Sequence, residues 1–344
     1  MKRKQSGFKI MMRLIKLVKP LAFFMVLAVI LGVTGFLCAI QITVVGSMTL
    51  LTAAGINGGL AIKTGCICII IFAVLRGFLH YGEQACNHYI AFKLLAIIRD
   101  KVFKSLRRLT PAKLEGKDKG NLISLITSDI ELLEVFYAHT ISPICIAFLT
   151  SLVMLIFIGR YSIWLMLVAL AAYITVGIII PLVSSKFNKN IGMTYRENSG
   201  ALSGYVLDSM RGLLESIRYN STDTRLNEMN EKTDELNSLQ KKLKKIEGHN
   251  ISITDISIIF FSITMLLVAI CLYQKGTIGF DGLIVSTVAM MSSFGPVAAL
   301  SNLAGNLTHT LASGERVLSI LDESPVVEAV SYTHLRAHET DQYL

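Results

Sequence analysis

Three ionisable side chains recur at helical spacing inside an otherwise apolar stretch. Arg76, His80 and Glu83 are separated by four and then three residues, so a helix would place all three on one face. Ionisable groups at membrane depth are costly and usually face a cavity or a partner. We therefore predict that this face contacts substrate or takes part in coupling. The alternatives are an ion pair between Arg76 and Glu83, or proximity to an interface where these side chains reach water.

The composition indicates the setting of this face. The chain has 344 residues, of which 53% are hydrophobic and 17% charged, with a mean hydropathy of +0.58. Such a chain is too apolar for a soluble domain, so we predict an all-α, multi-pass membrane protein. The net charge of +9 is explained by topology signals and contacts with anionic lipid, because no aromatic residues interleave with the basic runs as nucleic-acid binding would require. The six cysteines lack metal or C-x-x-C spacing and are predicted to be reduced, with a redox role for Cys66 and Cys68 as the alternative.

Six apolar runs are each long enough to cross a bilayer, which takes about 20 helical residues. We place them at 21 to the high 40s, from about 60 onward, and at 141–159, 162–183, 251–273 and 283–303. The pair Gly295 and Pro296 predicts a break inside the last run. Residues 8–19, which precede Pro20, are predicted to form an amphipathic helix lying in the membrane interface.

The basic residues are distributed asymmetrically between these runs. The proposed external segments hold only Lys63, Arg160 and Lys275, whereas the N-terminus and two long segments, 99–134 and 184–250, hold nearly all the others. Cytoplasmic loops carry the excess of Lys and Arg in membrane proteins. We therefore expect both termini and both long segments to be cytoplasmic, and the protein to lie in the plasma membrane.

Each long segment is predicted to be a helical hairpin, and the first is predicted to carry a short crosswise helix at its tip. In the first hairpin, Pro111 ends the incoming helix, and Ser128 with Glu131 has the spacing of a capping box, which predicts a new helix start. The apolar residues at the two tips are Leu122, Ile123 and Ile126, and Leu213, Leu214 and Ile217. Exposed apolar patches of this kind indicate docking surfaces, with packing inside the membrane domain as the alternative.

These features together resemble the transmembrane domain of a type I ATP-binding-cassette (ABC) exporter. The run GNLISLITSDI at 120–130 is similar to the pattern around that family's first coupling helix, GLLESIRYN at 212–220 lies where the second belongs, and ASGERVLSILDESPVV at 312–327 resembles the linker that follows the sixth helix. The resemblance implies an elbow helix within 1–20, a six-helix domain over 21–311, coupling helices near 119–127 and 212–220, and a linker over 312–330. The residues that would couple to an ATPase are Gly120, Leu122, Ile123, Ile126, Asp129, Leu213, Leu214, Ile217 and Arg218.

A narrower likeness suggests a substrate. HYIAFKLLAIIR at 88–99 and LTPAKL at 109–114 resemble the half-transporters that export cysteine and glutathione for cytochrome bd assembly. This likeness implies dimerisation with a second half-transporter, export of a small solute such as a thiol, and haem at His88, although a hydrogen-bonded interfacial histidine is the simpler interpretation. A multidrug or lipid exporter is an alternative, because architecture alone does not determine substrate. A membrane haem or redox protein without transport is another, and it would require His88 or His80 to bind a cofactor.

The sequence departs from the family pattern toward its C-terminus. It has no G-x-x-x-x-G-K-[ST] motif, so the phosphate-binding loop is absent and we expect ATP and Mg²⁺ to bind in an ATPase domain that this chain lacks. Residues 331–344, SYTHLRAHETDQYL, are polar and unlike the first strand of that domain. They resemble a translated sequencing adapter, and we expect them to be a non-native tail. An inert fragment is therefore a further interpretation of this polypeptide.

Overall fold

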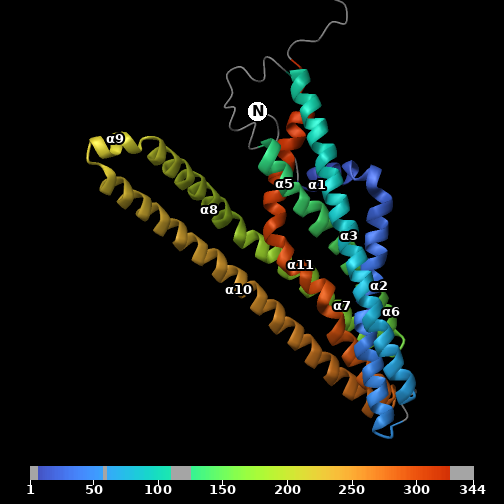
Figure 1. The fold of residues 1–344 in the computed structure, drawn as a ribbon. Helices are drawn as coiled ribbons and strands as arrows, with labels where there is room; N and C mark the ends of the chain where they lie inside the picture. Colours follow the sequence, from blue (N-terminus) through green and yellow to red (C-terminus); the bar gives the residue numbers. More distant parts are fainter. Residues whose placement is uncertain (1–6, 57–59, 110–124, 326–344) are drawn as a thin grey trace, which may run out of the picture.

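The computed structural model describes residues 7–56, 60–109 and 125–325, and these residues form helices without any strand. Within these ranges, six helical segments are long and apolar enough to cross a membrane. They are Lys19–Ala53, Ile62–Leu109, Ser142–Gly159, Ile163–Ser184, Thr222–Gln274 and Phe280–Ser301. The structure thus confirms the predicted all-α fold with six membrane-spanning helices (Figure 1).

The N-terminal part consists of a short helix followed by a long hairpin. Helix α1 spans Gly7–Leu17, close to the predicted interfacial helix, and the 3₁₀ turn η1 (Lys19–Leu21) carries Pro20 into α2 (Ala22–Ala53). Helix α3 (Ile62–Leu109) returns as one unbroken helix of 48 residues. Glycines bring α2 and α3 close together, since a Cβ on Gly35 would already lie 3.5 Å from Leu79 Cβ. Pro111, the predicted helix terminator, lies outside the described residues.

The segment 125–159 corrects one prediction. It is helical throughout, as the π-helix η2 (Leu125–Asp129), α5 (Ile130–Phe136), the π-helix η3 (Tyr137–Ile141) and α6 (Ser142–Gly159). The predicted helix start at Ser128 is therefore wrong, because the backbone is already helical from Leu125. The physical reason is that π-type bonding continues the helix, while the carboxylate of Asp129 contacts α11 instead of capping a helix end.

The second hairpin extends far from the rest of the molecule. Helix α7 (Ile163–Ile174) begins at Ser162, whose hydroxyl accepts from the Trp164 amide, and continues through the π-helix η4 (Thr175–Ile179) into α8 (Ile180–Arg211). The short helix α9 (Leu213–Arg218) forms the tip, and α10 (Thr222–Gln274) runs back over 53 residues. Figure 1 shows α8 and α10 side by side, with α9 at the end that projects away from the other helices.

Helix α11 (Phe280–Leu321) corrects a second prediction. Pro296 lies inside it, yet the helix continues for 42 residues, so the expected break at Gly295 and Pro296 is wrong. A proline removes one amide donor, and buried neighbours on either side, Phe294 and Val297, hold both halves against the core. Residues 312–321, expected to be linker, are also part of this helix.

Two apolar clusters hold these helices together. The larger one joins α2, α6, α7, α10 and α11 within the apolar spans. The other joins α1, α3, α5 and the last turns of α11, at the end of the molecule where Figure 1 shows these four elements converging. The long helix α11 therefore connects the larger cluster to the other one. We call this other cluster, near α1, α3 and α5, the basal cluster.

Candidate functional site

The three ionisable residues of α3 lie at different depths. Glu83 is buried, with 5% of its surface exposed, whereas Arg76 and His80 are exposed. The Nδ1 atom of His80 lies 3.2 Å from a carboxylate oxygen of Glu83. Among the described residues no ion pair joins Arg76 to Glu83, and the basic side chain next to the carboxylate is His80.

Glu83 reaches into the junction of α2, α3 and α6. A Cβ added to Gly32 of α2 would lie 3.2 Å from the carboxyl carbon of Glu83 and would overlap Ile146 of α6. Gly32 therefore leaves the room that the carboxylate occupies. A side chain of ordinary size at position 32 would displace Glu83, Ile146 or both.

Asn87, one turn further along α3, belongs to the same junction and was not predicted. Its side chain is buried, with 2% exposed, and its Nδ2 atom donates a hydrogen bond of 3.3 Å to Glu83. Its Oδ1 atom has no hydrogen-bond partner within the described part of the chain, and the same holds for the buried hydroxyls of Ser142 and Thr150 on α6. Asn87 lies four residues after Glu83, which places both on one face of a helix, and this spacing could have predicted their contact. We did not predict it because a single uncharged amide is not by itself unusual in a sequence.

His88, the predicted haem ligand, is exposed on α3. Its ring stacks on Phe92 of the same helix at a centroid distance of 6.0 Å, and Phe92 is itself 60% exposed. A group of three or more metal-binding side chains is absent from the described residues. This arrangement does not enclose a porphyrin, and haem binding at His88 stays a prediction.

The tip of the second hairpin presents an apolar surface. Leu213, Leu214 and Ile217 of α9 are 53%, 68% and 59% exposed, and Arg218 next to them is also exposed. Asn220, with φ of 51°, makes the sharp reversal into α10, and the Ser221 amide donates to the Ser216 carbonyl across the turn. The tip thus holds a defined shape. The hairpin behind it is tied by side chains, with Asn198 donating to Glu235 (3.0 Å) and Tyr205 to Glu228 (2.7 Å).

Only part of the other predicted coupling segment is described. Gly120, Leu122 and Ile123 lie outside the described residues, and Ile126 is half-buried against the basal cluster. Asp129 is buried and accepts hydrogen bonds from Arg316 and from the Ser313 hydroxyl (3.1 Å), both on α11. This segment is therefore anchored directly to the last turns of α11.

Further polar contacts attach α1 and α3 to the same end of α11. Arg13 of α1 donates two hydrogen bonds of 2.6 Å to Asp322, which raises the pKa of the arginine, and Tyr137 donates to the Leu14 carbonyl at 3.0 Å. Ser105 of α3 donates to the Ile320 carbonyl at 2.9 Å. Arg13 and Ser105 thus tie α1 and α3 to the end of α11, and Tyr137 ties η3 to α1.

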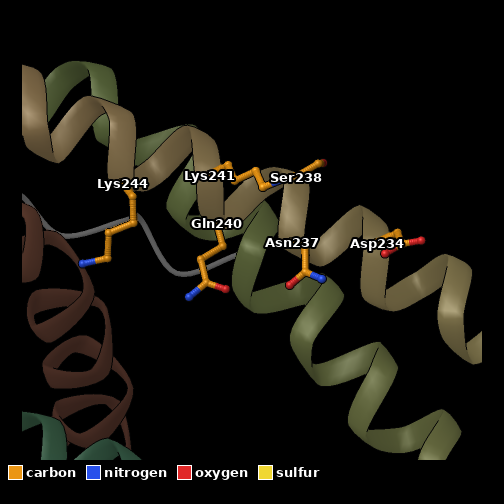
Figure 2. Close-up of a pocket in the computed structure, with 6 residues that line it drawn as sticks. All are labelled: Asp234, Asn237, Ser238, Gln240, Lys241 and Lys244. Atoms are coloured by element: carbon orange, nitrogen blue, oxygen red, sulfur yellow. The ribbon is translucent and has the colours of Figure 1, made fainter.

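Two pockets add contrasting surfaces. A polar one of ≈570 Å³ is lined by six residues that all come from α10, and Figure 2 shows their side chains along this one helix, so it is a surface hollow. An apolar one of ≈460 Å³ lies between α6, α7, η4, α8 and α11. It is bounded by residues such as Phe148, Ile178 and Leu300, with Tyr173 as a polar exception whose hydroxyl lies 2.5 Å from that of Ser293.

Comparison with known proteins shows a family to which most of this chain is similar. Residues 21–297 match the family model described as ABC transporter transmembrane region. A probable ABC transporter ATP-binding/permease protein of Haemophilus influenzae is 44% identical over 327 residues, which are 95% of this chain and 59% of that protein. The glutathione/L-cysteine transport system ATP-binding/permease protein CydC of the same species is 22% identical (74% and 45% covered), and an ATP-dependent lipid A-core flippase of Shewanella denitrificans is 23% identical (82% and 47% covered). The chain thus spans about half the length of these relatives.

Proposed function

This chain belongs to the family of ABC transporter transmembrane regions, and from that premise we propose that it is the permease part of an ATP-driven half-transporter that exports a small solute. It would act in a dimer, with both termini in the cytoplasm and ATPase domains docked on the projecting hairpins. The exposed apolar tip on α9 carries this proposal, because a rigid hairpin ending in Leu213, Leu214 and Ile217 needs a partner surface outside the membrane.

The mechanism requires a mechanical link between ATPase and membrane helices. Energy released outside the bilayer changes the membrane cavity only through elements that contact both parts. The α8–α9–α10 hairpin is one such element, and the contact of Asp129 with Arg316 and Ser313 gives the other predicted coupling segment a direct attachment to α11. Docking of an ATPase domain at either place would thereby move helices that continue into the membrane spans.

A thiol such as cysteine or glutathione is the first candidate solute. The name of one relative, 22% identical, specifies glutathione/L-cysteine transport, and the buried polar junction around Glu83 would suit a small polar solute. A lipid exporter is the second candidate, because lipid A-core flippases are similar at 23% identity and the ≈460 Å³ apolar pocket would accept an acyl chain.

Transport in inverted membrane vesicles tests the proposal. The permease is expressed with its ATPase domain, and ATP-dependent uptake of labelled cysteine and glutathione is measured. The variant Leu214→Asp should abolish ATP-dependent uptake while leaving the permease folded, because a charge at the tip disrupts apolar docking. Leu226→Asp is the matched control, since Leu226 is 50% exposed one turn into α10 and is not part of α9, and it should keep uptake. Equal loss in both variants would contradict docking at α9.

A further inference from the structure

We propose that Glu83 and Asn87 form the recognition point for an ammonium group, so that the solute of this permease carries a primary amine. The inference rests on the export function proposed above and assigns a chemical class to its substrate. It would favour an amino-acid-like solute over a lipid recognised through phosphate groups.

The first argument is charge. Glu83 is a buried carboxylate within an apolar span, and a buried charge is stable only when it is paired. The helices packed around it offer no cation: residues 21–62 contain no charged residue, and neither do residues 142–159. On α3 itself the adjacent partner is His80, whose side chain is 63% exposed. The junction therefore has a buried acidic group whose basic neighbour, His80, is largely exposed.

The second argument is hydrogen-bond chemistry. Asn87 Nδ2 already donates to one oxygen of Glu83, and His80 Nδ1 lies beside the other. What is left over at the junction is acceptor capacity, namely further lone pairs on the carboxylate and the buried Oδ1 of Asn87, which has no partner among the described residues. An ammonium group brings three donors and no acceptor, and it supplies the missing positive charge.

The third argument is the arrangement of α6. Ile146 contacts the position of Gly32 beside Glu83, and Ser142 and Thr150 lie four residues before and after it, on the same helix face. Because α3 and α6 are successive spans of opposite direction, Ser142 lies toward the level of Asn87. Both hydroxyls are buried and lack a partner in the described chain, and they add unused acceptors on the face of α6 that carries Ile146.

Two measurements on the full transporter test the inference. Calorimetric binding of L-cysteine is compared with that of N-acetyl-L-cysteine, which lacks the ammonium group, and ATP-driven uptake of both is measured in parallel. The wild type should bind the free amine at least about tenfold more tightly. Glu83→Gln should remove this preference, and Asn87→Ala should reduce it without removing the charge. Asp100→Asn, an exposed carboxylate on the same helix, should leave the preference unchanged.

The outcomes separate this inference from the proposed function. Uptake of thiols without any preference for the free amine would overturn the inference and leave thiol export standing. Amine binding that depends on Glu83, without uptake of either thiol, would overturn thiol export and keep the inference. If Glu83→Gln weakens both compounds equally while Asn87→Ala has no effect, Glu83 acts in packing or coupling and the inference fails.

Discussion

Asp129 and Arg316 show how burial makes the two members of one ion pair unequal. The Asp129 side chain is 3% exposed, whereas that of Arg316 is 55% exposed. Removing the carboxylate lets the arginine turn toward water. Removing the arginine leaves a buried carboxylate without its cation, which is the costlier change. The contribution of the pair to stability is therefore determined by its buried member.

From this asymmetry we predict the order of two variants. Arg316→Gln should lower the free energy of unfolding by about 2 kcal/mol and Asp129→Asn by about 1 kcal/mol, since a buried carboxylate that loses a charged donor costs more than the loss of a hydrogen bond. Thermal unfolding in detergent measures both. The double variant should be no less stable than Arg316→Gln alone. A larger loss in Asp129→Asn would contradict the argument.

Tyr137 gives a prediction about alkaline pH. Burial in the basal cluster raises the pKa of its phenol well above the ordinary value, and its hydroxyl donates to the Leu14 carbonyl. Because the folded state holds this proton more tightly, the stabilisation is complete below about pH 10 and is lost as the pH rises above it. Tyr137→Phe should cost about 1 kcal/mol at neutral pH and should flatten the alkaline decline, as seen by thermal unfolding across pH. If the loss of stability at alkaline pH is the same in the variant, that loss is caused by other titrating groups.

At the scale of elements, α11 is the helix to which the others attach. Within the spans it contributes Ala289, Met290 and Phe294 to the larger cluster, and its last turns contribute Val317 and Leu318 to the basal cluster. Helix α1 packs on those last turns closely enough that a Cβ on Gly314 would lie 2.8 Å from the Leu14 methyl. Helix α1 and the end of α11 are therefore expected to move as one unit.

A valine at position 314 tests this attachment. Gly314→Val should lower the free energy of unfolding by about 1–3 kcal/mol, because Leu14 is buried and has no room to move, and α1 should become more accessible to protease. Gly204→Val on α8 is the matched control, since a Cβ there meets nothing within 4 Å. It should be neutral. Equal stability of the two variants would mean that α1 adapts without cost.

At the scale of the whole molecule, the features that could be predicted from the sequence are those that depend on residues close together in the chain. The length of apolar runs predicted the six spans, and the resemblance of residues 212–220 to a known family placed a short helix at the tip of the second hairpin, where α9 lies. The exposed Leu214 agrees with that interpretation, although its role in docking stays a prediction. Such features depend on residues adjacent in the chain.

What the sequence could not predict depends on residues far apart. The capping-box spacing at Ser128 does not mark a helix start, because the backbone is already helical from Leu125, and Asp129 beside it bonds to α11, 184 residues away. Pro296 does not break α11 because packing on both sides holds it. The burial of Glu83 depends on the missing side chain of Gly32 and on Ile146, and no periodicity on α3 reveals either contact.

The orientation of the molecule remains a prediction from charge, and labelling from either side of the membrane tests it. In a cysteine-free background, a cysteine at Tyr219, 82% exposed at the hairpin tip, should react with an impermeant maleimide only in inverted vesicles. A cysteine at Lys275, in the short turn between α10 and α11, should react only in intact cells. The reason is that the segment 184–250 carries many basic residues, whereas the turn carries one. Reversed labelling would place α9 outside the cell, where no ATP-driven domain could dock, and would overturn the coupling mechanism together with the topology.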